Sequence, residues 1–179
     1  MSSKKKRRTA GVLALATELA ELRDDGEFGL FDVDEANLLR WTVHLSQKFI
    51  ASTDTNLACM LNIWAARFAK EASIVLDIHF PNDYPGSVPF VRIVRPRMVF
   101  HTGHVTVGGS ICTELLTNQG WRPMTVASLL RTVVLTMKEG DAQVQLEPDA
   151  HCTTPAIDYS EAEARAAFSR VAAFHGWKP

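Results

Sequence analysis

A strand–turn–strand pattern occupies residues 72–94, whose sequence is ASIVLDIHFPNDYPGSVPFVRIV. Every second residue from Ala72 to Phe80 is apolar, which is the period-two pattern of a β-strand with one face in a core. Three prolines within residues 81–89 then impose a rigid turn, and a second apolar run follows over residues 90–94. The segment therefore predicts two strands separated by a proline-rich turn.

Strands and helices flank this segment in separate groups. The same alternation over residues 39–45 predicts a strand, and residues 28–33 predict a shorter one before it. Helical spacing predicts a first helix capped by Thr9, a second over residues 57–68, and two after residue 125. The last of these opens with a capping box, Ser160 and Glu163. Strands grouped between helices predict an α+β fold with an antiparallel meander sheet, an N-terminal helix and C-terminal helices.

Composition and charge narrow the class of protein. A chain of 179 residues that is 46% hydrophobic suits one domain. Five of its 19 basic residues lie at positions 4–8, so residues 9–179 carry 14 basic and 20 acidic side chains, a net charge of −6. We expect a disordered basic tail over residues 1–8 and a single domain over residues 9–179. The acidic domain argues against nucleic acid as a partner.

Localisation follows from what the sequence contains. No apolar run approaches the 18 or more residues that a membrane helix needs, and no signal-type stretch follows the basic N-terminus, so we expect no membrane association. Three cysteines do not indicate a disulfide framework. The prediction is a cytoplasmic or nuclear protein, whose basic run is a nuclear localisation signal, a partner contact or a solubilising tail.

A long irregular segment is the candidate functional region. It covers residues 97–122, RMVFHTGHVTVGGSICTELLTNQGWR, and connections this long inside a compact domain are usually functional. Cys112 is its candidate nucleophile, and Gly108 and Gly109 would leave room beside the thiol for a bulky carbonyl donor. Three other interpretations stay open: a buried structural cysteine, a cysteine hydrolase with a histidine base, and a zinc site. Their residues would be His101 or His104 as the base, and His101, His104, Cys112, His151 and Cys152 as zinc ligands.

The surroundings of Cys112 resemble the ubiquitin-conjugating enzyme family. FPNDYPGSVPFVRI, then GGSIC, then WRP and an amphipathic helix follow one another in the order of that family. The resemblance extends to its divergent Q class through GGxxCxELLTxQGW, present here over residues 108–121. The C-terminal segment is also similar to the last helix of that class. The likeness spans residues 10–179 and implies the ubiquitin-conjugating fold with a long active-site loop.

The resemblance also implies a chemistry. Cys112 would accept the terminal glycine of ubiquitin, or of a ubiquitin-like protein, as a thioester and pass it to a substrate lysine. The implied partners are ubiquitin or a ubiquitin-like protein, an activating enzyme, a ubiquitin ligase and a protein substrate, with no cofactor and no metal. The residues Trp121 and Pro123 match a W-x-P motif that is expected to pack beneath the loop. Asp141 lies in the loop whose acidic residue acts on the incoming lysine.

This chain departs from the family at three places. The family's His-Pro-Asn motif is missing, and His104 stands where the oxyanion-stabilising asparagine would be. Gly86 replaces an apolar side chain that contacts ligases. The first helix carries acidic residues where the family has basic ones, so the tail at residues 4–8 is expected to contact the activating enzyme instead. The alternative function is a non-catalytic ubiquitin-binding variant of the same fold.

Overall fold

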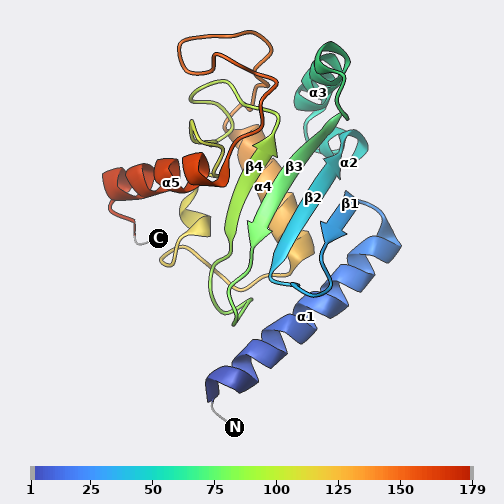
Figure 1. Ribbon diagram of the computed structural model, residues 1–179, viewed down its shortest axis with the longest axis vertical. Helices are drawn as coiled ribbons and strands as arrows, with labels where there is room; N and C mark the ends of the chain where they lie inside the picture. Colours follow the sequence, from blue (N-terminus) through green and yellow to red (C-terminus); the bar gives the residue numbers. More distant parts are fainter. Residues whose placement is uncertain (1–2, 178–179) are drawn as a thin grey trace.

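A four-stranded antiparallel sheet forms the centre of the protein (Figure 1). The computed structural model describes residues 3–177, with side chains from residue 11 onward. The strands β1 (Gly29–Val33), β2 (Arg40–Ser46), β3 (Ser73–His79) and β4 (Phe90–Arg95) follow one another in chain order as a meander. The predicted α+β fold with a meander sheet is confirmed.

Five α-helices within residues 3–177 surround the sheet. They are α1 (Ser3–Asp25), α2 (Gln47–Ala51), α3 (Thr55–Phe68), α4 (Val126–Glu139) and α5 (Glu161–His175), with a short 3₁₀ helix at Glu114–Leu116. Helix α4 lies behind the sheet and α5 lies beside the β4 edge (Figure 1). The predicted caps Thr125 and Ser160 are present, the second as a complete capping box with Glu163. No helix in this described part of the chain is long and apolar enough to cross a membrane.

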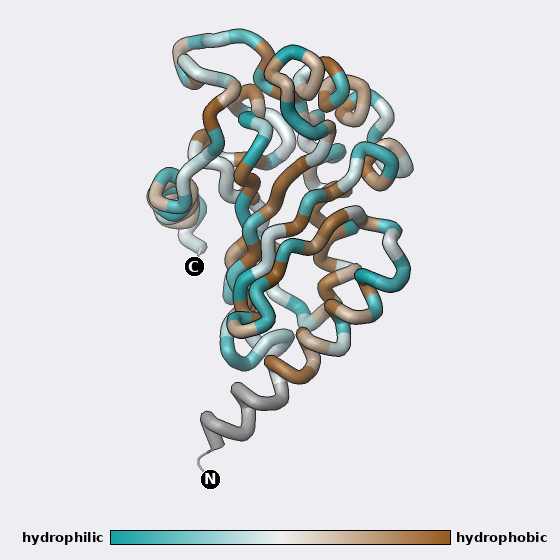
Figure 2. The backbone as a smooth tube through the Cα atoms, turned by 45° about the vertical axis from the view of Figure 1, so that its right-hand side comes forward, coloured by the Kyte–Doolittle hydropathy of each residue, from teal (hydrophilic) through white to brown (hydrophobic). Residues whose placement is uncertain are grey.

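The core lies between the sheet and α4. Trp41, Val43 and Leu45 alternate along β2 and are fully buried. Leu129 and Val133 on α4 belong to the same cluster of buried side chains. Figure 2 shows hydrophobic residues concentrated along the strands and hydrophilic residues along the connecting loops. The period-two and helical spacings of the sequence therefore locate the core correctly.

The first helix begins earlier than the sequence pattern suggests. It starts at Ser3, so Thr9 lies inside α1 and does not cap it. The expected disordered tail is wrong for residues 3–8, because lysine and arginine are good helix formers and extend the helix N-terminally. The side chains of residues 1–10 lie outside the described part of the chain. The predicted stop at Gly26 is present, with a left-handed φ of 64°.

The β3 strand is buried on both faces. Its alternation predicted one buried face, and Ile74, Leu76 and Ile78 do point into the core. On the other face Ser73, at 1%, and Asp77, at 2%, are also buried. This second burial arises because the chain returns to the sheet just before α5, where Tyr159 N–H donates to the carbonyl of Val94 at 2.8 Å.

Candidate active site

The thiol of Cys112 follows a tight turn in the irregular segment. Val105 pairs with Ile111 across this turn, and the Cys112 N–H donates to the His104 carbonyl at 2.6 Å. Inside the turn the Thr106 and Ser110 hydroxyls are 2.7 Å apart and buried. These bonds hold the thiol in one place on a segment that sequence periodicity left undefined. The Cys112 N–H is already engaged, so an oxyanion at this site needs donors from elsewhere.

Cys112 lies in a groove of about 420 Å³. The side chain is half-buried, and burial raises the pKa of its thiol, so little thiolate is present at neutral pH. His104 lines the same groove and is exposed. The structure thus brings together the two residues that the sequence proposed as nucleophile and oxyanion donor.

The residue Asp141 lies at the mouth of this groove. It follows α4 with a left-handed φ of 51°, is exposed, and its neighbour Gly140 lines the groove. The Gly140 carbonyl accepts from the Gly103 N–H at 2.7 Å, which ties this loop to the segment that carries His104. The carboxylate therefore stands near the nucleophile without being part of the groove wall.

The two glycines before Cys112 accommodate α5. A Cβ atom at Gly108 would lie 2.2 Å from the Glu163 carbonyl oxygen, and one at Gly109 would lie 2.7 Å from the Tyr159 ring. The expectation that these glycines leave room for a carbonyl donor is wrong, because the chain's own C-terminal segment fills that room. Their absence of side chains instead allows α5 to pack against the active-site segment.

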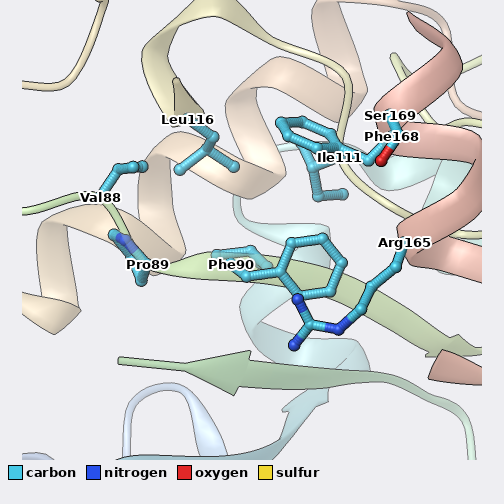
Figure 3. Close-up of a pocket in the computed structure, with 9 residues that line it drawn as sticks. Val88, Pro89, Phe90, Ile111, Leu116, Arg165, Phe168 and Ser169 are labelled. Carbon is cyan, nitrogen blue, oxygen red and sulfur yellow. The ribbon is translucent and has the colours of Figure 1, made fainter. Parts of the chain in front are cut away.

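Helix α5 separates two grooves. The second groove, of about 290 Å³, is lined by Phe90, Ile111, Leu116, Arg165 and Phe168 and is shown in Figure 3. Ile111 faces this groove, whereas its neighbour Cys112 lines the larger one.

The sequence missed the walls that α5 contributes to both grooves. Spacings of three residues at Phe168, Val171 and Phe174 were a signal for an apolar helix face. That signal does not say against what the face lies. Only the packing of α5 beside Cys112 reveals that residues far along the chain belong to the site.

The W-x-P motif contributes packing. Trp121 is 7% exposed, and its indole N–H donates to the Pro85 carbonyl at 2.8 Å. Tyr84 is buried, and its hydroxyl donates to the Met124 carbonyl at 2.7 Å. The proline-rich turn and the end of the irregular segment are thereby joined.

A buried ionic cluster ties α5 to the sheet. Asp77 accepts from Arg40 Nη2 at 2.8 Å, from Arg92 Nε at 2.8 Å and lies 3.1 Å from His79 Nε2. Burial by itself would raise the pKa of Asp77, but the hydrogen bonds of His79 and Arg40 and the charge of Arg92 hold it well below its usual range. Glu161 on α5 completes the cluster through Arg40 at 3.3 Å.

The predicted zinc ligands do not come together. Among the described residues, the only set of three or more potential metal ligands within 4.8 Å of one another is Asp77, His79 and Glu161. The guanidinium groups of Arg40 and Arg92 already neutralise that set. The zinc interpretation of Cys112 is therefore wrong, because its five residues are spread over loops that do not converge.

Comparison with known proteins defines the class. A family model described as ubiquitin-conjugating enzyme matches residues 42–167. Ubiquitin-conjugating enzyme E2 Q-like protein 1 of Mus musculus is 29% identical over 164 residues, covering 89% of this chain and 92% of that protein. Its Homo sapiens counterpart is 32% identical over 108 residues, covering 58% of this chain and 63% of that protein. The chain belongs to the ubiquitin-conjugating enzyme family.

Other relatives refine this assignment. Ubiquitin-conjugating enzyme E2 Q1 of Homo sapiens is 41% identical over 73 residues, which cover 40% of this chain and 17% of that longer protein. The structure of human ubiquitin-conjugating enzyme E2 G1 is similar with a TM-score of 0.48 and 23% identity, covering 71% of this chain and 93% of that one. Within the family, this chain is related to the Q class.

Proposed function

We propose that this protein carries ubiquitin, or a ubiquitin-like protein, as a thioester on Cys112 and transfers it to a substrate lysine. The observation that carries the proposal is a half-buried thiol in a groove, held by the turn at residues 105–111, in a chain of this family. A thioester keeps the carbonyl activated for attack by an amine. Membership of the family implies ubiquitin, an activating enzyme and a ligase as partners in general.

Two exchanges make up the reaction. In the first, Cys112 Sγ attacks the carbonyl of the thioester on the activating enzyme, whose cysteine leaves as a thiolate. In the second, a neutral lysine amine attacks the new thioester, Cys112 leaves as a thiolate, and the amine loses a proton as the amide forms. ATP is consumed only by the activating enzyme, so this chain needs no cofactor for either exchange.

The test is incubation with ubiquitin, an activating enzyme and ATP, followed by electrophoresis without reductant. The expected product is an adduct that disappears on addition of a thiol. A non-catalytic ubiquitin-binding variant of the fold would yield no adduct under these conditions. A cysteine hydrolase would release ubiquitin and form no adduct that depends on ATP.

The site suggests roles for two further residues. The His104 imidazole is exposed in the groove, so it can donate a hydrogen bond to the oxyanion that develops during lysine attack. The Asp141 carboxylate at the groove mouth is placed to orient the incoming ammonium group and to favour its approach. Both roles concern discharge of the thioester and not its formation.

Loss of the His104 imidazole is expected to slow discharge. Removing one oxyanion donor lowers the rate of well-studied hydrolases by about 10²–10³-fold, and an exposed histidine should act at or below that range. In single-turnover discharge to free lysine, His104→Ala should be clearly slower while charging of Cys112 stays near wild type. His104→Asn should recover part of the rate, since an amide also donates and asparagine tolerates the left-handed backbone.

The backbone at His104 requires a second variant. Its φ of 52° is strained for alanine but not for glycine. His104→Gly removes the imidazole without that strain, so it should discharge as slowly as His104→Ala. If His104→Gly discharges at the wild-type rate, or if charging and discharge fall together, the histidine only supports the loop.

The basic run is expected to assist charging. If residues 4–8 contact the activating enzyme, deleting residues 1–8 should slow charging more at low salt than at high salt. Exposed charges are screened over about 10 Å at 0.1 M salt. Replacing the five basic residues by glutamine, a comparable helix former, keeps the length of α1 and should have the same effect. Equal charging rates for both variants and wild type at each salt concentration would leave localisation or solubility as the role of the run.

A further inference from the structure

The last two turns of α5 form a wall of the Cys112 groove. Val171 and Phe174, three residues apart, line it together with Cys112. Phe174 is 86% exposed, the highest value among the exposed large hydrophobic residues of the described chain. A large apolar ring left open to solvent is a feature of binding surfaces, especially beside a reactive group.

The same wall offers hydrogen-bond donors. Arg170 lines the groove, is exposed, and has no ion pair or hydrogen bond with any described residue. Its helical neighbours four residues away, Ala166 and Phe174, carry no charge. The other titratable side chains that line the groove, besides the Cys112 thiol, are His101, His104 and His175, and its lining holds no carboxylate; Asp141 stands only at the mouth. The groove is therefore complementary to a ligand with acceptor oxygens and an apolar side chain.

Chemistry restricts what can occupy this groove. For a thioester to form, the terminal carbonyl of the carried protein must reach Cys112 Sγ, so the residues before it must run along the groove in an extended form. An extended chain has unpaired backbone carbonyls, which suit the donors of an arginine. Its side chains alternate in direction, so one can face α5 while its neighbours face away.

We propose that α5 is the element that recognises the C-terminal tail of the carried protein. Phe174, supported by Val171, covers one apolar side chain of the tail, and Arg170 donates to its backbone carbonyls. The inference rests on the proposed function and assigns donor selection to α5. Phe174 is a specificity-determining residue in this assignment, and the bond-making steps remain with the loop residues.

A coupled mutant series tests the assignment in the charging reaction. Phe174→Ala should lower kcat/KM for the donor-loaded activating enzyme roughly tenfold, since burial of an aromatic side chain is lost. Phe174→Leu should restore most of it. Leu135→Ala is the matched control, because Leu135 is 48% exposed on α4 and lies outside the groove lining. Thermal unfolding of all three variants should match wild type.

Donor variants identify the contact. When each apolar side chain of the donor tail is replaced in turn by alanine, one replacement should slow wild type but cause little further loss in Phe174→Ala. This non-additivity is the mark of a direct contact. Fully additive effects for every tail position would overturn the assignment of Phe174.

A second measurement needs no activating enzyme. In a Cys59→Ala, Cys152→Ala background, Cys112 reacts by thiol–disulfide exchange with a donor-tail peptide ending in a thiopyridyl disulfide, which releases pyridinethione. Phe174→Ala and Arg170→Ala should each slow this exchange severalfold, whereas exchange with a small thiopyridyl disulfide should stay unchanged. Equal slowing with both reagents, or none with either, would overturn the proposal.

The two measurements separate the possible failures. If the wild-type protein forms no enzymatic adduct but the peptide exchange still depends on Phe174, the proposed function fails and tail recognition by α5 stands. If charging proceeds and neither measurement depends on Phe174, the proposed function stands and the tail is recognised elsewhere.

Discussion

Cys112→Ala is expected to abolish the reductant-sensitive adduct with ubiquitin completely. The thioester sulfur comes from this residue in the proposed reaction, and no other side chain of the groove can supply one. The comparison is made on a gel without reductant after incubation with ubiquitin, an activating enzyme and ATP. A Cys112→Ser variant should instead trap an oxygen ester that survives thiol treatment, because a hydroxyl can replace the thiol as acceptor.

The other cysteines are the matched controls. Cys59 is exposed on α3, and Cys152 is 8% exposed with its pKa raised by burial, so neither lies in the Cys112 groove. Cys59→Ala and Cys152→Ala should therefore charge like wild type. Equal charging by all three alanine variants would show that the assignment of Cys112 is wrong.

Asp77→Ala should lower the free energy of unfolding by about 3–5 kcal/mol. Removing one partner of a buried ionic cluster leaves the remaining charge uncompensated, and Arg92, with a side chain only 7% exposed, would be left without its carboxylate. For a domain of this size the loss corresponds to a fall in melting temperature of about 6–20 °C. Urea unfolding followed by circular dichroism measures the difference.

The effect of Asp77 should also depend on pH. Because its pKa is held below the unfolded value of about 3.9, the carboxylate stabilises the fold fully above that pH. This contribution is lost as the pH falls below about 4 towards the folded pKa, so wild type and Asp77→Ala should converge there. Asp32→Ala is the control, since Asp32 is an exposed carboxylate on β1, and it should change stability by less than about 0.5 kcal/mol. A similar loss in both variants would contradict a special role for the cluster.

Local sequence patterns determined most of the fold. Alternating residues in β2 and β3, the cap at Thr125 and the capping box at Ser160 each depend on neighbours in the chain, so their period or spacing is visible in the sequence. The candidate nucleophile was also recognisable, because Cys112 stands in a motif that resembles a known family. The start of α1 was wrong because the basic run has ample helix propensity and no breaker.

Only the tertiary structure decided what surrounds Cys112. The position of α5 depends on long-range contacts, among them the ion pair of Arg97 with Glu163 at 3.1 Å and the packing of Gly108 against the α5 backbone. Such contacts join residues far apart in the chain, so no local period encodes them. The glycines therefore pointed to the right loop for the wrong reason, and Phe174 was assigned to a helix face before anything showed that this face borders the thiol. The sequence thus specified the elements and the nucleophile, whereas packing of the C-terminal helix decided the shape of the groove in which that nucleophile lies.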